Sequence, residues 1–236
     1  MKDNATPFYK EAAAAVDAGL RKYMLNVFSY MSAGLAISAV VAYLVSVSPA
    51  LMSIFFSSPV VAILVMLVPL GISIYFSARI AHISASTAGT LFVVFAACLG
   101  LTLAPIFLVY SGESIALTFF ITSAMFLSMV IYGYVTGKDL TGFGAFLFMG
   151  LIGLIIASIV NLFVQSSAFM FVISIIGVVI FTGLTAYDTQ LIKSIYFSDD
   201  TEEVTQKKAI FGALQLYLDF VNLFLYILRL VGSRRN

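Results

Sequence analysis

Long, uninterrupted hydrophobic segments dominate the pattern of this chain, and short polar connections separate them. A helix needs about 20 apolar residues to cross the roughly 30 Å hydrocarbon core of a bilayer. Seven segments of that length occur, at about residues 24–46, 55–78, 87–110, 115–136, 143–164, 169–187 and 210–231. Apolar and polar residues do not alternate within them, which excludes a membrane β-barrel. The pattern therefore predicts an all-α, polytopic membrane protein with seven hydrophobic helices.

The connections between the segments indicate a single membrane domain over residues 23–236. Most are short and carry turn residues, as in Gly137-Lys138-Asp139, and only the sixth, Lys193 to Lys208, is long and charged. Residues 1–22 form a separate N-terminal segment. Apolar residues at near-helical spacing within residues 8–23 fit a short cytoplasmic helix at the membrane interface, and a polar tail fits them as well.

Composition supports a membrane location and excludes several classes of function. Hydrophobic residues make up 62% of the chain and charged residues only 10%, whereas an ordinary soluble domain is about 25% charged. The formal net charge is +1, so no basic excess indicates a nucleic-acid partner. One cysteine, Cys98, and one histidine, His82, are too few for a zinc enzyme or a disulfide framework, and we expect no cofactor.

The distribution of Lys and Arg predicts the orientation in the membrane. Loops on the N-terminal side carry nine such residues, and loops on the other side carry none, Glu113 being their only charge. Because basic residues remain on the cytoplasmic side, we expect a cytoplasmic N-terminus. Arg229, Arg234 and Arg235 follow the last segment. They lie outside if that segment crosses fully, and inside if it does not.

The last hydrophobic segment carries an acidic residue near its middle. Asp219 would cost about 2.5–3.5 kcal/mol at the centre of a lipid-exposed helix, so such residues usually mark a site or a pathway. Further polar residues follow at steps of three and four on the same helix face, namely Gln215, Asn222, Tyr226 and Arg229. We therefore expect the last helix to be central and wrapped by the other six, which would keep this polar stripe away from lipid.

Two more ionisable residues lie near the cytoplasmic ends of their segments. Asp188 ends the sixth segment and Arg79 ends the second, at the same depth and on the same side. Both could simply extend to the interface or form an inert ion pair. Alternatively they could converge with Asp219 into one site.

Two carboxyl groups close together in a low dielectric cannot both ionise cheaply, so such a pair responds to pH. Protonation would also loosen any hold of Arg79 on Asp188. When deprotonated, Asp188 and Asp219 would offer oxygen ligands to a small cation. A tight calcium site needs six to eight oxygens, so we expect only weak, transient Ca²⁺ binding.

Three segments of the chain resemble the Bax inhibitor-1 (transmembrane BAX inhibitor motif) family. They are Leu184-Thr-Ala-Tyr-Asp-Thr-Gln190, Gly212-Ala-Leu-Gln-Leu-Tyr-Leu-Asp-Phe-Val-Asn-Leu-Phe-Leu225 and Gly100-Leu-Thr-Leu-Ala-Pro-Ile-Phe107. The ending Leu-Arg-Leu-Val-Gly-Ser-Arg-Arg is similar to bacterial members, which implies a multi-pass protein of the bacterial inner (plasma) membrane. The resemblance implies seven helices, with the last one between two layers of three. It also implies a pH-sensitive calcium leak, closed by Asp188, Asp219 and Arg79.

Two other functions remain open from the sequence. A non-conducting regulator would bind another membrane protein and use the polar stripe only for packing. An intramembrane aspartyl protease would use two acids to activate water, but such enzymes carry Gly-x-Gly-Asp where this chain reads Leu216-Tyr217-Leu218-Asp219. We therefore expect no enzymatic activity, and expect the lipid bilayer and small cations as the partners.

Overall fold

The computed structural model describes the backbone of residues 7–235 and the side chains of residues 18–235. Seven spans are long and apolar enough to cross a membrane, as the hydropathy pattern predicts. They are formed by α1, α3, α4 together with α5, α6, α7, α8 and α9, while α2 is a short additional helix. The bounds are α1 Pro7–Ser46, α2 Pro49–Phe56, α3 Pro59–Arg79, α4 Ala85–Leu103, α5 Ile106–Val109, α6 Gly112–Val135, α7 Thr141–Val164, α8 Ser167–Ser194 and α9 Glu202–Val231.

Several boundaries differ from the expected ones, and at two of them capping residues, not hydropathy, set the start of the helix. The second span begins at Pro59, not at residue 55, because proline favours the first helical turn. The last helix begins at Glu202, not at residue 210, because the Thr201 side chain accepts a hydrogen bond from the Val204 N–H. The expected long charged connection therefore shrinks to residues 195–201, and most of its charges belong to α9.

The described part of the N-terminal segment continues directly into the first span. From Pro7 onward the backbone of α1 is helical without a break up to Ser46. Residues 1–6 lie outside the described residues, as do the side chains of residues 1–17. The predicted contact of this segment with the membrane interface therefore stays a prediction.

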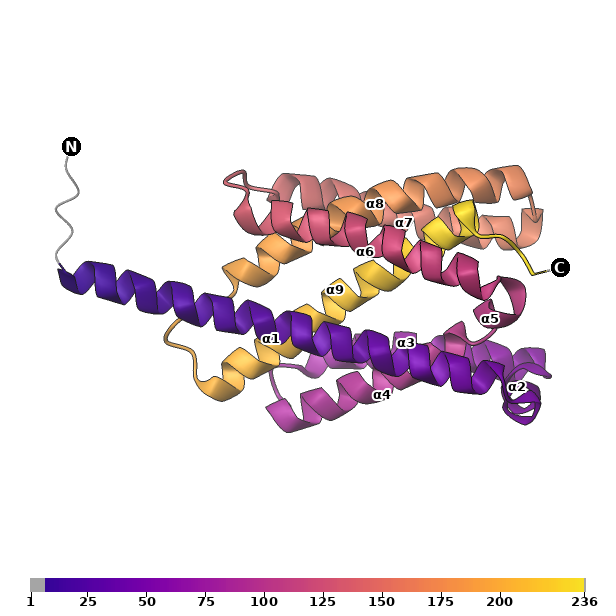
Figure 1. The fold of residues 1–236 in the computed structure, drawn as a ribbon, viewed down its shortest axis with the longest axis horizontal. Helices are drawn as coiled ribbons and strands as arrows, with labels where there is room; N and C mark the ends of the chain where they lie inside the picture. The colour runs from indigo at the N-terminus through magenta and orange to yellow at the C-terminus, as the bar shows by residue number, and fades with distance from the viewer. Residues whose placement is uncertain (1–6, 236) are drawn as a thin grey trace.

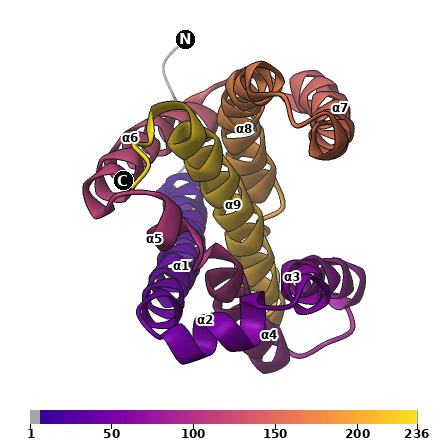
Figure 2. The same ribbon diagram turned by 90° about the vertical axis from the view of Figure 1, so that its right-hand side faces the viewer.

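The spans form two groups with α9 between them (Figures 1 and 2). In one group α4 packs against α1 and α3, and in the other α8 packs against α6 and α7. The main contacts of α9 are with α8, α1, α6 and α4, whereas α3 and α7 pack chiefly against α4 and α8. In the most apolar stretch of α9, 61% of the residues are buried, against at most 44% in the corresponding stretch of any other span. The last helix is thus the most buried span, but four neighbours, not six, make most of its contacts.

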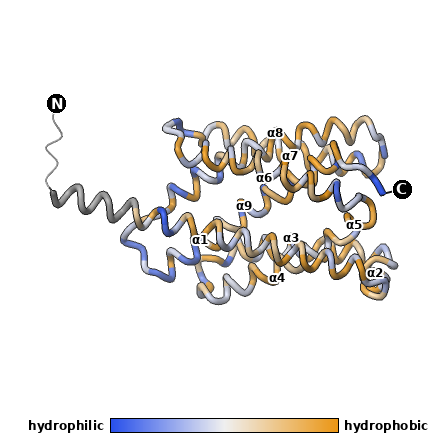
Figure 3. Tube along the Cα trace, in the orientation of Figure 1, coloured by the Kyte–Doolittle hydropathy of each residue, from blue (hydrophilic) through white to orange (hydrophobic). Residues whose placement is uncertain are grey.

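The last helix crosses the whole bundle, so Arg229, Arg234 and Arg235 lie at the opposite end of the bundle from the start of α1. The end where α1 begins is here called the N-terminal end, and the end where α9 finishes the C-terminal end (Figure 1). Hydrophilic residues gather at these ends, and hydrophobic residues line the spans (Figure 3). The C-terminal tail is fixed at its end, since the Ser233 N–H donates to Ser114 Oγ (2.8 Å) and the Arg235 N–H to the Val109 carbonyl (2.8 Å).

A buried hydrogen-bonded group joins three of the spans. The Ser38 hydroxyl on α1 lies 2.6 Å from the Ala96 carbonyl on α4 and 2.6 Å from the Tyr217 hydroxyl on α9. The edges of Phe92 and Phe95 surround the Tyr217 ring, with centroid distances of 6.0 and 5.6 Å. This group fixes the position of α9 against α1 and α4 in the interior.

Tyr217→Phe should lower the stability of the protein by about 1 kcal/mol, because it removes one buried hydrogen bond and leaves the aromatic packing in place. Thermal unfolding in detergent measures the change. Tyr43→Phe is the matched control, since Tyr43 is 55% exposed on the same helix as Ser38. Equal unfolding midpoints for the two variants would show that the Ser38–Tyr217 bond does not stabilise the bundle.

Candidate functional site

Asp219 is a buried acid in the middle of the most buried span. Its side chain is only 4% exposed, and its Oδ2 atom has no hydrogen-bond donor among the described side chains and backbone. The residue lies roughly 21–26 Å along α9 from its first turn, Glu202–Thr205, at a rise of 1.5 Å per residue. A buried carboxyl oxygen without a protein partner is uncommon, and it needs a proton or a cation.

The register of α8 against α9 brings Asp188 to Asp219. The two helices are antiparallel and closely packed. On one side of the acids Gly212 packs against Ile192, and on the other side Gly177 packs against Tyr226. Between these two contacts the carboxyl groups of Asp188 and Asp219 lie within hydrogen-bonding reach of each other. Asp188 is only partly buried, so the pair extends from the interior towards the N-terminal end.

A hydrogen bond between two carboxyl groups requires a proton on one of them. The basic residues nearest in sequence are placed elsewhere: Lys193 Nζ donates to the Tyr134 carbonyl, Lys208 pairs with Asp200, and Arg229 is exposed at the far end of α9. α4 carries no charged residue, α6 only Glu113 in its first turn, and α1 none after Lys22. The pair can therefore hold a shared proton, or a small cation in its place.

Arg79 is not part of this pair in the structure. Its side chain is exposed at the end of α3, and it forms no ion pair within the described side chains. The reason is the position of α3, which packs chiefly against α4 and ends beside the start of α9, where Lys207 Nζ donates to the Ala81 carbonyl (3.3 Å). Asp219 lies three turns further along α9, ~18 Å from Lys207. The expected convergence therefore holds for the two acids and not for the arginine.

The residues of the polar stripe on α9 lie in different surroundings. Gln215, one turn before Asp219, has a buried Oε1 with no partner in the described protein. Asn222 donates to the Leu218 carbonyl of its own helix (2.8 Å). Tyr226 stacks on Phe181, and Arg229 is exposed at the C-terminal end with its guanidinium 5.2 Å from the Tyr226 ring centroid.

Sequence reasoning missed several polar side chains of the interior. The hydroxyls of Thr118 on α6 and Thr182 on α8 are buried without a protein partner. Ser38 and Tyr217 form the group described above. The spacing of Thr118 and Thr122, four residues apart in an apolar segment, is a signal that could have indicated a buried face of α6.

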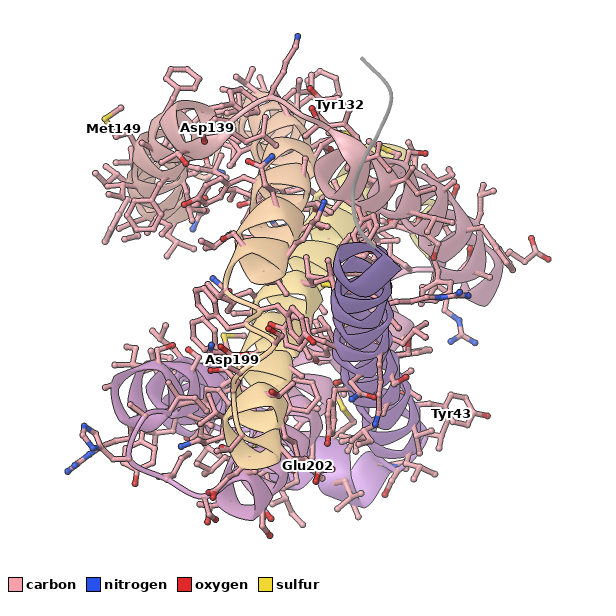
Figure 4. All side chains as sticks on the ribbon, turned by 90° about the vertical axis from the view of Figure 1, so that its left-hand side faces the viewer. Tyr43, Tyr132, Asp139, Met149, Asp199 and Glu202 are labelled. Carbon is pink, nitrogen blue, oxygen red and sulfur yellow. The ribbon has the colours of Figure 1, made fainter. Side chains whose placement is uncertain are left out.

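The charged residues at the N-terminal end supply no further ligand cluster among the described residues. Figure 4 shows Asp139, Asp199 and Glu202 at this end. Hydrogen bonds from Thr141, through its side chain and its N–H, lower the pKa of Asp139. Within residues 18–235 no three His, Cys, Asp or Glu residues are grouped as a metal site would require. Asp188 and Asp219 alone could offer only a partial shell to Ca²⁺.

Comparison with known proteins agrees with this arrangement. Residues 20–236 match the family model described as inhibitor of apoptosis-promoting Bax1. The inner membrane protein YbhL of Escherichia coli K12 is 46% identical over 220 residues, which cover 92% of this chain and 94% of that protein. A protein of Borreliella burgdorferi is 48% identical over 217 residues, covering 91% of this chain and 93% of its own. A protein of Rickettsia prowazekii is 48% identical over 221 residues, covering 93% of each. The chain therefore belongs to the Bax inhibitor-1 family.

Proposed function

We propose that the protein is a pH-sensitive cation leak channel, with Ca²⁺ as a transported ion, and that the contact between Asp188 and Asp219 closes it. The observation that carries the proposal is a pair of facing carboxyl groups between two membrane-spanning helices. In a bilayer, ionisable residues inside the spans usually mark ion or proton pathways.

The pair responds to pH through the strength of its hydrogen bond. With one shared proton, the bond is charge-assisted and holds α8 against α9. A second proton makes both groups neutral, and a neutral hydrogen bond is roughly half as strong. Acidification therefore weakens the closing contact and raises the leak. This mechanism needs no arginine, and a cation passing an opened pair would meet only weak, transient ligands.

We also propose that the chain lies in the bacterial inner membrane with a cytoplasmic N-terminus. YbhL is named an inner membrane protein. In the described part of the chain, the N-terminal end of the bundle carries more Lys and Arg than the C-terminal end, which has Arg229, Arg234 and Arg235. A reporter fused to Asn236 should be active only outside the cytoplasm, because seven spans place the two ends on opposite sides.

A non-conducting regulator is the second candidate function. It is favoured by one observation, that the main cavities lined by described residues do not include Asp188 or Asp219 in their walls. Calcium flux from proteoliposomes, measured between about pH 6 and 8, separates the candidates, since the pair is expected to gain its second proton on acidification. Flux that rises on acidification supports the channel, and absence of flux at every pH favours the regulator. Cleavage of a helical peptide would instead indicate a protease.

Arg79→Gln should leave the pH profile of the leak unchanged, because the Arg79 side chain is exposed and forms no ion pair among the described side chains. The segment after α3 contacts α9 at Lys207, about three helical turns along α9 from Asp219. This result would differ from the expectation drawn from the sequence, in which Arg79 holds the closed state. Lys138→Gln, which removes another exposed cation at the same end, is the control. A leak that is high at neutral pH in Arg79→Gln alone would return the arginine to the closing contact.

A further inference from the structure

An apolar groove lies between the two groups of helices, on the side where α1 and α6 face each other. Its volume is about 390 Å³. Residues of α9 complete the lining between α1 and α6. Small residues on α1 and α6 leave the groove open between bulkier side chains. The residues that define it are Leu35 and Ala39 on α1, Ala116 and Phe119 on α6, and Phe220 and Phe224 on α9.

The groove opens to the bilayer at the depth of the spans. Ala39, Ala116 and Phe120 are exposed along it and belong to membrane-spanning helices. At that depth the surrounding medium is hydrocarbon, and a polar or charged ligand would lose its hydration without gaining partners. An acyl chain is the ligand that matches both the lining and the surroundings.

A second pocket, here called the polar pocket because Glu113 and Arg235 line it, continues the groove at the C-terminal end, although most of its lining is apolar. Its volume is about 650 Å³, and it shares Phe107 and Gly112 with the groove. The short helix α5, which carries Phe107, lies between the ends of α1 and α6 (Figure 2). Glu113 and Arg235 both line this pocket, and they form no ion pair with each other within the described side chains. One acidic and one basic residue, Glu113 and Arg235, thus lie in the pocket that adjoins the apolar groove.

We propose that the groove and the polar pocket together bind one zwitterionic phospholipid with a primary amine headgroup, of the phosphatidylethanolamine class. One acyl chain occupies the groove, the phosphate meets Arg235, and the ammonium group meets Glu113. The guanidinium presents a fork of N–H donors that suits phosphate oxygens. An ammonium group donates N–H hydrogen bonds to a carboxylate, whereas a choline headgroup has no N–H donor. An anionic headgroup such as phosphatidylglycerol could still place its phosphate against Arg235, but it has no ammonium group, so the Glu113 carboxylate would stay unpaired.

Native mass spectrometry of the purified, delipidated chain titrated with phosphatidylethanolamine tests the groove. The double variant Ala39→Phe/Ala116→Phe should lose the bound-lipid peak, because two rings fill the space for the acyl chain. Ala124→Phe is the matched control, since Ala124 is also exposed on α6 but does not line the groove, and it should retain the peak. Equal lipid binding in all three proteins would overturn the proposal.

The headgroup assignment has its own test in the same titration. The wild type should bind phosphatidylethanolamine more tightly than phosphatidylcholine or phosphatidylglycerol, and Glu113→Gln should remove this preference. Arg235→Gln should weaken binding of all three lipids by about two- to fivefold, as expected for partly exposed charge pairs. Equal affinity of the wild type for the three headgroups would refute the assignment. If the double variant does not fold, as judged by thermal unfolding, Ala116→Leu takes its place and should weaken binding of every lipid.

Discussion

Asp188→Ala should raise the leak at neutral pH by about ten- to a hundredfold, above the level that the wild type reaches in acid, because the acid state keeps a neutral hydrogen bond and the variant keeps none. The substitution removes one of the two facing carboxyl groups, whose contact closes the channel in the proposed mechanism. A hydrogen bond to a charged group stabilises a contact by about 1.5–3 kcal/mol, and each 1.4 kcal/mol is a factor of ten in the equilibrium between closed and open states. Calcium release from proteoliposomes measures the change.

Asp188→Asn is the matched control for this prediction. The amide N–H₂ can donate to the Asp219 carboxylate, as the protonated Asp188 does, so the neutral-pH leak should stay low. The double variant Asp188→Asn/Asp219→Asn contains no titratable group at the contact. Its leak should therefore be the same at every pH tested, and it should resemble the acid state of the wild type.

Two results would contradict this mechanism. One is a neutral-pH leak of Asp188→Ala equal to that of the wild type, which would show that the pair does not close the channel. The other is a retained pH response in the double asparagine variant, which would place the sensing group elsewhere. Thermal unfolding of each variant identifies a leak caused by loss of the fold. This control is needed because Asp219 is buried, 4% exposed, and Asp188→Ala takes away the group that faces it.

The sequence was sufficient to predict the spans and the buried acid, because both follow from the cost of exposing a chemical group in lipid. Hydrocarbon tolerates long apolar helices and little else, so hydropathy located seven spans. Asp219 was expected to face away from lipid, and it is buried. Where capping decides, as at Thr201 and Pro59, hydropathy placed the ends of helices several residues away from their positions in the structure.

The position of Arg79 could not be predicted, because it depends on which helices are neighbours. Its depth along the second span was read correctly, at the same end of the bundle as Asp188. Depth alone does not show that α3 lies on the outer side of α4. The polar stripe on α9 also depended on contacts that spacing alone does not give. Helical spacing placed Arg229 on the same face as Asp219, but Arg229 lies near the end of α9 and is exposed there.

Glycines within the spans differ in whether a neighbouring helix packs against them. Gly100 packs directly on the backbone of Ser38 across α1 and α4, as a small residue in an apolar span indicates. Gly153, on the fifth hydrophobic segment, has no neighbour that a side chain would meet. A glycine in a span is therefore a candidate for close packing, and only the partner helix shows whether it is used.

Gly133→Ala should destabilise the protein by about 1–3 kcal/mol, because a Cβ atom at this position would overlap the backbone of Ala186 on α8. Backbone atoms cannot move aside as a flexible side chain can, so α6 and α8 must separate. Ala186 is two residues from Asp188, and the displacement should also raise the neutral-pH leak. Thermal unfolding in detergent and calcium release from proteoliposomes measure the two effects.

Gly153→Ala supplies the comparison that separates packing from helix propensity. Alanine favours a helix over glycine by about 1 kcal/mol in either position. Gly153 faces open space, so its substitution should leave the unfolding midpoint unchanged or raise it slightly. A destabilisation of the same size in both variants would mean that glycine is needed for the helices themselves and not for the contact of α6 with α8. A loss confined to Gly133→Ala would instead locate the constraint at the crossing of α6 and α8, two residues from Asp188.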